Sequence, residues 1–87
     1  MHEFSIMEKL FKIIEQNAKQ NRLVTINKIY LTIGELCQIN ADYLKFAFNE
    51  IAKDTIAIDA ELLIETIPGK DITLDSIEGE QQDENHH

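Results

Sequence analysis

The chain contains little cysteine, proline and glycine and no tryptophan. Its 87 residues include one cysteine, one proline, three glycines and no tryptophan. The single cysteine, Cys37, cannot form an internal disulfide, and without a Cys-x-x-Cys companion it cannot build a tetrahedral thiolate zinc site in one chain. We expect it to be a half-buried apolar residue. A chain of this length forms one domain that buries only about 60% of its unfolded surface, so no large cleft is expected.

Basic residues and long apolar runs are also scarce. Eight lysines and arginines stand against sixteen aspartates and glutamates, which gives a net charge of −8. This charge repels phosphate backbones and anionic lipids, so it disfavours binding to nucleic acid or membrane surfaces and favours a basic partner. No apolar stretch approaches the roughly 18 residues of a membrane-spanning helix, and the N-terminus lacks the pattern of a signal peptide. The sequence therefore predicts a soluble, cytoplasmic protein.

Two amphipathic helices are predicted. Ser5-Ile6-Met7-Glu8 has the pattern of a capping box, which would start the first helix. Apolar residues then recur at helical spacing as far as Ala18, and the helix ends near Asn21. Asn40 is a good N-cap for a second helix. The apolar stripe of that helix consists of Leu44, Ala47, Phe48, Ile51 and Ala52. Tyr43 and Phe46 lie on its flanks.

Three strands are predicted. Residues Val24–Ile33 are rich in β-branched side chains, and a change of parity near Asn27-Lys28 indicates a bulge or a bend. The segments Glu61–Ile67 and Ile72–Ile77 have the pattern of two further strands. Between them stands the turn sequence Pro68-Gly69-Lys70-Asp71. We therefore expect these two strands to form a hairpin, or at least to be neighbours.

The order helix, strand, helix, strand, strand predicts an α+β fold, with one three-stranded sheet and two helices packed on one face. The single domain is expected to span residues 1–78. Residues 79–87 contain no apolar side chain and predict a disordered acidic tail, whose His86 and His87 are either native or part of a purification tag. The expected core consists of Leu10, Ile14, Ile29, Leu31, Ile33, Phe48, Ile51, Leu62, Ile64, Ile72 and Leu74.

The first three residues form a candidate metal chelate. The α-amine of Met1 and the backbone nitrogen of His2 close a five-membered ring, and the His2 imidazole closes a second ring. The backbone nitrogen of Glu3 fills the fourth corner. Four nitrogens in a plane suit Ni(II) or Cu(II) better than Zn(II). The alternative is that His2 is a solvated residue on a frayed end.

The side-chain carboxylate of Glu3 has two possible roles. Its carboxylate either accepts a hydrogen bond from the imidazole or contributes a favourable charge near the N-terminus of the helix. The sequence leaves both roles open.

Several separate segments carry a family resemblance. They are, in order, Met1-His2-Glu3-Phe4-Ser5-Ile6-Met7, Ile33-Gly34-Glu35-Leu36, Leu44-Lys45-Phe46-Ala47-Phe48, Ile67-Pro68-Gly69 and Leu74-Asp75-Ser76-Ile77-Glu78. Together they resemble the HypA/HybF family of nickel-insertion accessory proteins for NiFe hydrogenase. The resemblance implies that Met1, His2 and Glu3 hold Ni(II). It also implies that the partners are the hydrogenase large subunit and a nickel-handling maturation GTPase.

One departure from the family pattern is large. Family members carry a zinc domain with two pairs of cysteines between Ile67-Pro68-Gly69 and the last strand, where this chain has Lys70-Asp71. No structural zinc is therefore expected, and the shorter form is either natural or engineered. Two functions stay open: a metallochaperone that delivers Ni(II) during hydrogenase maturation, and a metal-free interaction module that docks on the GTPase or a hydrogenase subunit.

Catalysis is not expected. The acids Asp42, Asp54 and Asp59 are dispersed along the chain, and no serine or cysteine has a histidine nearby in the sequence. We expect the protein to be a monomer or a weak dimer, because a three-stranded sheet has free edges.

Overall fold

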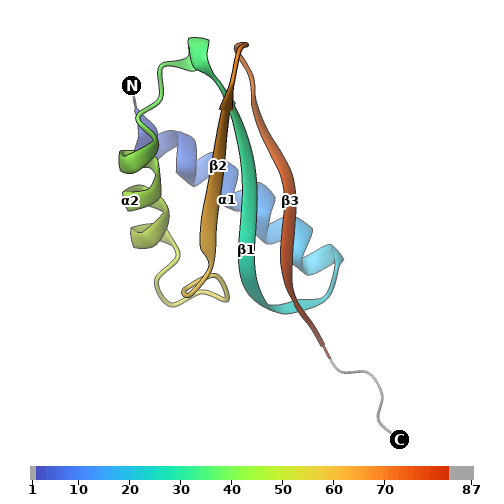
Figure 1. Cartoon of the computed structure of the whole chain (residues 1–87). Coiled ribbons are helices and arrows are strands. Elements are labelled where there is room, and N and C mark those ends of the chain that lie inside the picture. The colour runs from blue at the N-terminus through green and yellow to red at the C-terminus, as the bar shows by residue number, and fades with distance from the viewer. Residues whose placement is uncertain (1, 83–87) are drawn as a thin grey trace, which may run out of the picture.

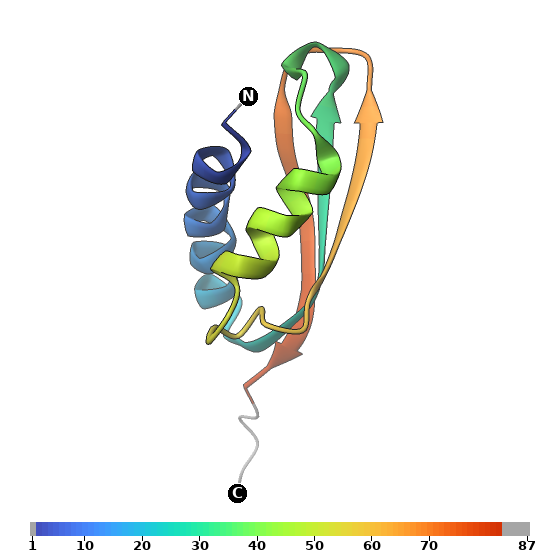
Figure 2. The same cartoon turned by 90° about the vertical axis from the view of Figure 1, so that its left-hand side faces the viewer.

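In the computed structural model, which describes residues 2–82, two helices pack on one face of a three-stranded sheet (Figures 1 and 2). The elements are α1 (Glu3–Gln20), β1 (Leu23–Gly34), the short 3-10 helix η1 (Glu35–Cys37), α2 (Ala41–Ile51), β2 (Glu61–Ile67) and β3 (Ile72–Gln81). The predicted α+β class and element order are confirmed. No helix in the described part of the chain is long and apolar enough to cross a membrane.

The sheet topology differs from the prediction. The strand order is β2-β1-β3, with β2 parallel and β3 antiparallel to the central β1. The predicted hairpin is wrong, because β1 lies between the two strands. The connection Pro68–Asp71 crosses the end of β1, where the amides of Gly34 and Leu36 donate to the carbonyls of Asp71 and Gly69, both at 2.8 Å. A turn sequence predicts a reversal of the chain but not what lies between the two arms.

Gly34 makes this crossing possible. A Cβ atom at position 34 would lie 2.4 Å from the backbone carbon and oxygen of Gly69 and 2.6 Å from the nitrogen of Lys70. Only a residue without a side chain allows the backbone of the loop to come so close. The geometry of the turn thus depends on a residue at the end of another strand.

The strand β3 continues further than predicted. Its residues Glu80 and Gln81 pair with Thr25 and Leu23 at the start of β1. This pairing uses backbone groups, so the absence of apolar side chains does not end the strand. The boundary predicted at residue 79 is therefore too early, and residues 83–87 of the predicted tail lie outside the described part of the chain.

The core lies between the helices and the sheet. The predicted bulge is confirmed, because the register of β1 against β3 shifts between Ile26 and Lys28, and both Ile26 and Ile29 are buried. The rings of Phe11 and Phe48, 6.1 Å apart, join α1 to α2. The predicted core residues Leu10, Ile14, Ile29, Leu31, Ile33, Phe48 and Leu62 are buried. Four others are only partly buried against this core: Ile51, Ile64, Ile72 and Leu74.

Candidate metal site at the N-terminus

Helix α1 begins earlier than the sequence predicts. His2 is its N-cap, and the amide of Ile6 donates to the carbonyl of His2 at 3.1 Å. The capping box predicted from Ser5 to Glu8 is wrong, because both residues lie inside the helix. His2 and Glu3 are therefore part of the helix start, with no flexible lead between them and the fold.

The side chain of Glu3 explains the early start. Glu3 is only 5% exposed, and its Oε2 accepts a hydrogen bond from the backbone N–H of Asn40 at 2.9 Å. Asn40 is the N-cap of α2, and its side chain accepts from the amide of Tyr43, also at 2.9 Å. The first turn of α1 is thus tied to the first turn of α2, and both helices start toward the same end of the molecule (Figures 1 and 2).

This contact also sets the charge of Glu3. The hydrogen bond from the Asn40 amide lowers the pKa of Glu3 from its ordinary value of 4.5, and its own amide acts in the same direction, while burial opposes them. The carboxylate is therefore ionised at neutral pH. One of the two roles predicted for this carboxylate was a charge near a helix N-terminus. The carboxylate does lie at the N-terminus of α1, and it also accepts a hydrogen bond from the N-cap of α2.

Two of the predicted nickel-ligating residues, His2 and Glu3, lie within the described part of the chain, at the N-terminal end of α1. The first four N–H groups of a helix have no partner inside it, and the first helical hydrogen bond here comes from Ile6. The backbone nitrogens of His2 and Glu3 are therefore not needed by the helix. His2 is exposed and its side chain does not cap the helix. Met1, whose amine would complete the planar set, lies outside the described residues.

Other candidate ligands do not gather. Within residues 2–82, no group of three or more His, Cys, Asp or Glu side chains is placed to hold a metal ion. Cys37 is half-buried, as predicted, and its Sγ donates to the carbonyl of Lys70 at 3.2 Å. The thiol therefore supports the loop that crosses β1. His86 and His87 lie outside the described residues.

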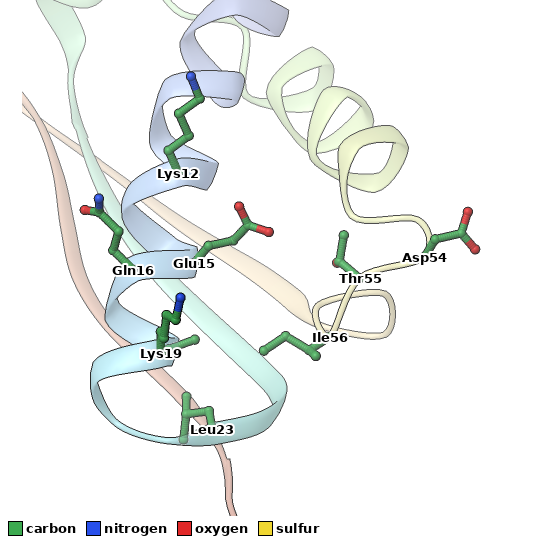
Figure 3. Close-up of a pocket in the computed structure, with 9 residues that line it drawn as sticks. Lys12, Glu15, Gln16, Lys19, Leu23, Asp54, Thr55 and Ile56 are labelled. Atoms are coloured by element: carbon green, nitrogen blue, oxygen red, sulfur yellow. The ribbon is translucent and has the colours of Figure 1, made fainter.

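An open groove of about 830 Å³ lies at the other end of α1 (Figure 3). Sequence reasoning missed it, because it forms where the end of α1 and the start of β1 meet the turn that follows α2. Glu15 and Ile56 point into it, while the carboxylate of Asp54 points away (Figure 3). Its walls carry both signs of charge, with the lining residues Lys12, Glu15, Gln16, Ala18, Lys19, Leu23, Asp54, Thr55 and Ile56. The expectation of no large cleft was too strict, but the groove is open to solvent.

These features describe a small α+β domain with His2 and Glu3 at the start of its first helix. A family model described as "Hydrogenase/urease nickel incorporation, metallochaperone, hypA" matches residues 1–75. The chain belongs to the HypA family. This is a family of nickel metallochaperones and not of enzymes, in agreement with the expectation from the sequence.

Individual relatives agree with this assignment. Hydrogenase maturation factor HypA of Rhodopseudomonas palustris (strain BisA53) is 36% identical over 69 residues, which are 79% of this chain and 61% of the relative. The protein of the same name from Legionella pneumophila (strain Corby) is 40% identical over 72 residues, or 83% of this chain and 64% of the relative. The chain thus spans about three-fifths of the length of the curated relatives it matches.

A solved structure shares the fold. The solution structure of the Ni metallochaperone HypA from Helicobacter pylori has a TM-score of 0.81 to this chain, over 94% of this chain and 100% of that one. The sequence identity is 20%. At this identity the likeness shows the common fold.

Proposed function

We propose that this chain binds Ni(II) as cargo and delivers it during maturation of NiFe hydrogenase. The ligands in this proposal are the amine of Met1, the imidazole of His2, and the backbone nitrogens of His2 and Glu3. Membership of the HypA family supports nickel as the metal. The hydrogen bond from the Asn40 amide to the Glu3 carboxylate is the observation that carries the proposed site, because it fixes the helix start while His2 stays exposed.

The anchoring of Glu3 matters for chelation. A free terminus must lose backbone freedom when it closes around a metal, and fixing one residue costs on the order of 1–2 kcal/mol. Part of this ordering is already present here, because Glu3 is helical and its side chain is buried. The ionised carboxylate also places a negative charge near the incoming cation.

Proton release should govern the affinity. An α-amine has a reference pKa of about 7.7 to 8.0 and an imidazole one of about 6.5, and a ligating amide must lose its proton as well. We therefore expect nickel affinity to rise steeply with pH. The same dependence gives a route for release, because a partner that supplies protons or competing ligands removes the metal.

Calorimetric titration with Ni(II) tests the site. The protein should have a native N-terminus and lack the last two residues, His86 and His87, because their imidazoles are potential nickel ligands outside the proposed site. We expect His2→Ala, or one extra residue before Met1, to abolish tight binding. Glu8→Gln is a matched control, since it changes another acid in the first turns of α1 that is exposed. Unchanged binding in the His2→Ala protein, or in the extended one, would refute the chelate.

Delivery requires partners. We propose the hydrogenase large subunit as the recipient and a maturation GTPase as the source of nickel, with all three in the cytoplasm. The acidic charge of the chain favours basic surfaces on these partners. Pull-down of each partner at low and high salt tests this, because association driven by opposite charges weakens with salt.

A metal-free interaction module is the second candidate. The single cysteine favours it, because the chain cannot form the thiolate zinc site that the family resemblance implies. This function predicts that His2→Ala still binds the GTPase and still supports hydrogenase maturation in cells. The metallochaperone function predicts that His2→Ala binds the partner but fails to support maturation.

A further inference from the structure

The groove of Figure 3 continues along α1 toward the start of this helix. A second groove, of about 620 Å³, is lined by residues of α1 between Ser5 and Glu15 and by Ile51 of α2. Lys12 and Glu15 line both grooves, so the two are continuous. We call the combined feature the α1 groove. It follows α1 from Ser5 to Lys19, which is about 21 Å at the helical rise of about 1.5 Å per residue.

Apolar side chains contribute to the lining of the α1 groove. Phe11 and Ala18 of α1 are buried, and Ile51 of α2 is partly buried. Ile56, in the turn after α2, is 41% exposed and points into the groove (Figure 3). Exposed apolar surface that is rimmed by polar residues is typical of a site that binds the apolar face of another protein.

The rim of the α1 groove carries charges of alternating sign. Acidic and basic residues follow one another along α1 at intervals of three or four positions, which places them on one side of the helix. They are Glu8, Lys12, Glu15 and Lys19. All four are exposed, and within the described part of the chain none of them forms an ion pair or a side-chain hydrogen bond. Their charges are therefore available to another molecule.

An α-helix fits this groove better than an extended segment does. An extended segment needs partners for its backbone N–H and C=O groups, whereas the wall formed by α1 offers side chains, because the backbone groups of a helix bond to each other. A docked helix satisfies its own backbone in the same way. It also presents one side chain per turn along its flank, about 5.4 Å apart, which matches the spacing of the charges on α1.

The alternating charges define the occupant further. Lys or Arg must face Glu8 and Glu15, and Asp or Glu must face Lys12 and Lys19, so a uniformly acidic or basic helix meets two like charges. Such repulsion discriminates between partners. Helix α1 of a second copy carries suitable charges, but its apolar face is buried in its own core. The occupant is therefore a helix of a different protein.

We propose that the α1 groove is a docking site for an amphipathic helix of another protein, about four turns long. The apolar face of this helix covers Ile56, and its flank carries acidic and basic side chains in alternation. Helices that dock in grooves place apolar anchors at intervals of three and four residues. Docking uses none of the proposed nickel ligands, so a test on the metal-free protein is independent of the nickel proposal.

Binding of a labelled synthetic peptide to the metal-free protein, followed by fluorescence anisotropy, tests the proposal. The peptide has about 15 residues with leucine on one face, and a lactam link on the opposite side keeps it helical before it binds. We expect a peptide with alternating Lys and Glu on its flank to bind the wild type. Ile56→Glu should weaken this binding at least about tenfold. Ile58→Glu is the matched control, because Ile58 is 56% exposed and does not line the groove, and it should leave binding unchanged.

Two variants of equal net charge test the rim. Lys12→Glu with Lys19→Glu makes the rim uniformly acidic, whereas Lys45→Glu with Lys70→Glu changes two exposed lysines outside the groove. A second peptide carries Lys at every flank position. For each variant, the dissociation constant of the all-Lys peptide is divided by that of the alternating peptide, and comparing these ratios cancels the attraction due to net charge. We expect the ratio to be about tenfold lower in the rim variant.

Three results would overturn the proposal. One is a wild-type protein that does not bind the alternating peptide. Another is an equal loss of binding in Ile56→Glu and Ile58→Glu. The third is the same ratio of dissociation constants in the two charge variants. The substituted residues are all exposed, so each variant should stay folded, and circular dichroism checks this before binding is compared.

Discussion

The buried carboxylate of Glu3 should control nickel affinity without touching the metal. The perturbation is Glu3→Ala, which removes the acceptor for the Asn40 amide and frees the start of α1. Glu3→Gln is the milder change, because its side-chain oxygen can still accept from that amide while the negative charge is lost. Asn40→Ala is the matched control: it removes the cap on the Tyr43 amide but keeps the backbone N–H that Glu3 binds.

The expected magnitudes follow from the contacts. In Glu3→Ala, metal binding must order the backbone of His2 and position 3, and ordering one residue costs about 1–2 kcal/mol. Ordering these two residues therefore costs about 2–4 kcal/mol, and since 1.4 kcal/mol is a factor of ten in affinity, nickel binding should weaken by about thirtyfold to several hundredfold. Glu3→Gln should weaken it less than tenfold. Asn40→Ala should lower the free energy of unfolding by about 1 kcal/mol and leave nickel affinity nearly unchanged.

Two measurements separate anchoring from ligation. Calorimetry on protein without His86 and His87 gives the three affinities, and the visible absorption of bound Ni(II) reports its coordination. We expect the absorption spectrum of Glu3→Gln to match that of the wild type, because the carboxylate is occupied by the Asn40 amide. Wild-type affinity in Glu3→Ala would refute the anchoring role, and a changed spectrum in Glu3→Gln would show that the carboxylate is a ligand.

Three further predictions concern stability. The pKa of Glu3 in the folded state lies below its ordinary value of 4.5, so the contribution of Glu3 to stability is present above pH 4.5 and is lost as pH falls through the folded pKa. The free energies of unfolding of wild type and Glu3→Gln should therefore converge at low pH. A difference that stays constant with pH would contradict this. Gly34→Ala forces the loop away from β1 and should cost about 1–3 kcal/mol in urea unfolding, whereas wild-type stability would show that the loop moves freely. Phe48→Ala should lower the free energy of unfolding by about 3–5 kcal/mol, because Phe48 is 1% exposed. Phe46→Ala, at a 51% exposed position, should lower it by less than about 1 kcal/mol. Equal losses of stability in the two variants would place the core elsewhere.

The sequence predicted the elements well because local patterns determine them. Asn40 caps α2 as predicted, since an N-cap needs only a short polar side chain beside a helical pattern. The bulge near Lys28 was readable from the change of parity, because side chains alternate strictly along a strand. These signals lie within a few residues of the structure that they specify.

Non-local contacts were not predictable in the same way. The capping box at Ser5 was locally plausible, but the Glu3 carboxylate binds an amide 37 residues later in the chain and extends the helix to Glu3. The strand order failed for the same reason. Pro68 and Gly69 predict a turn, while the place of β1 between β2 and β3 depends on Gly34, which is far away in the sequence. Of the candidate site, the residues could be named from the sequence, but the anchor that holds them could not.

The loop that crosses the end of β1 makes this domain a natural acceptor for inserted sequence. The loop is exposed from Pro68 to Lys70, and such exposed tips tolerate insertions. Its two ends are held to β1 and η1 by hydrogen bonds at Gly69 and Asp71, so added residues between these points need not disturb the sheet. Anything inserted there emerges at the end of the molecule where α1 begins (Figures 1 and 2). A fused reporter or second domain at Lys70 would therefore sit beside the nickel-binding end proposed here.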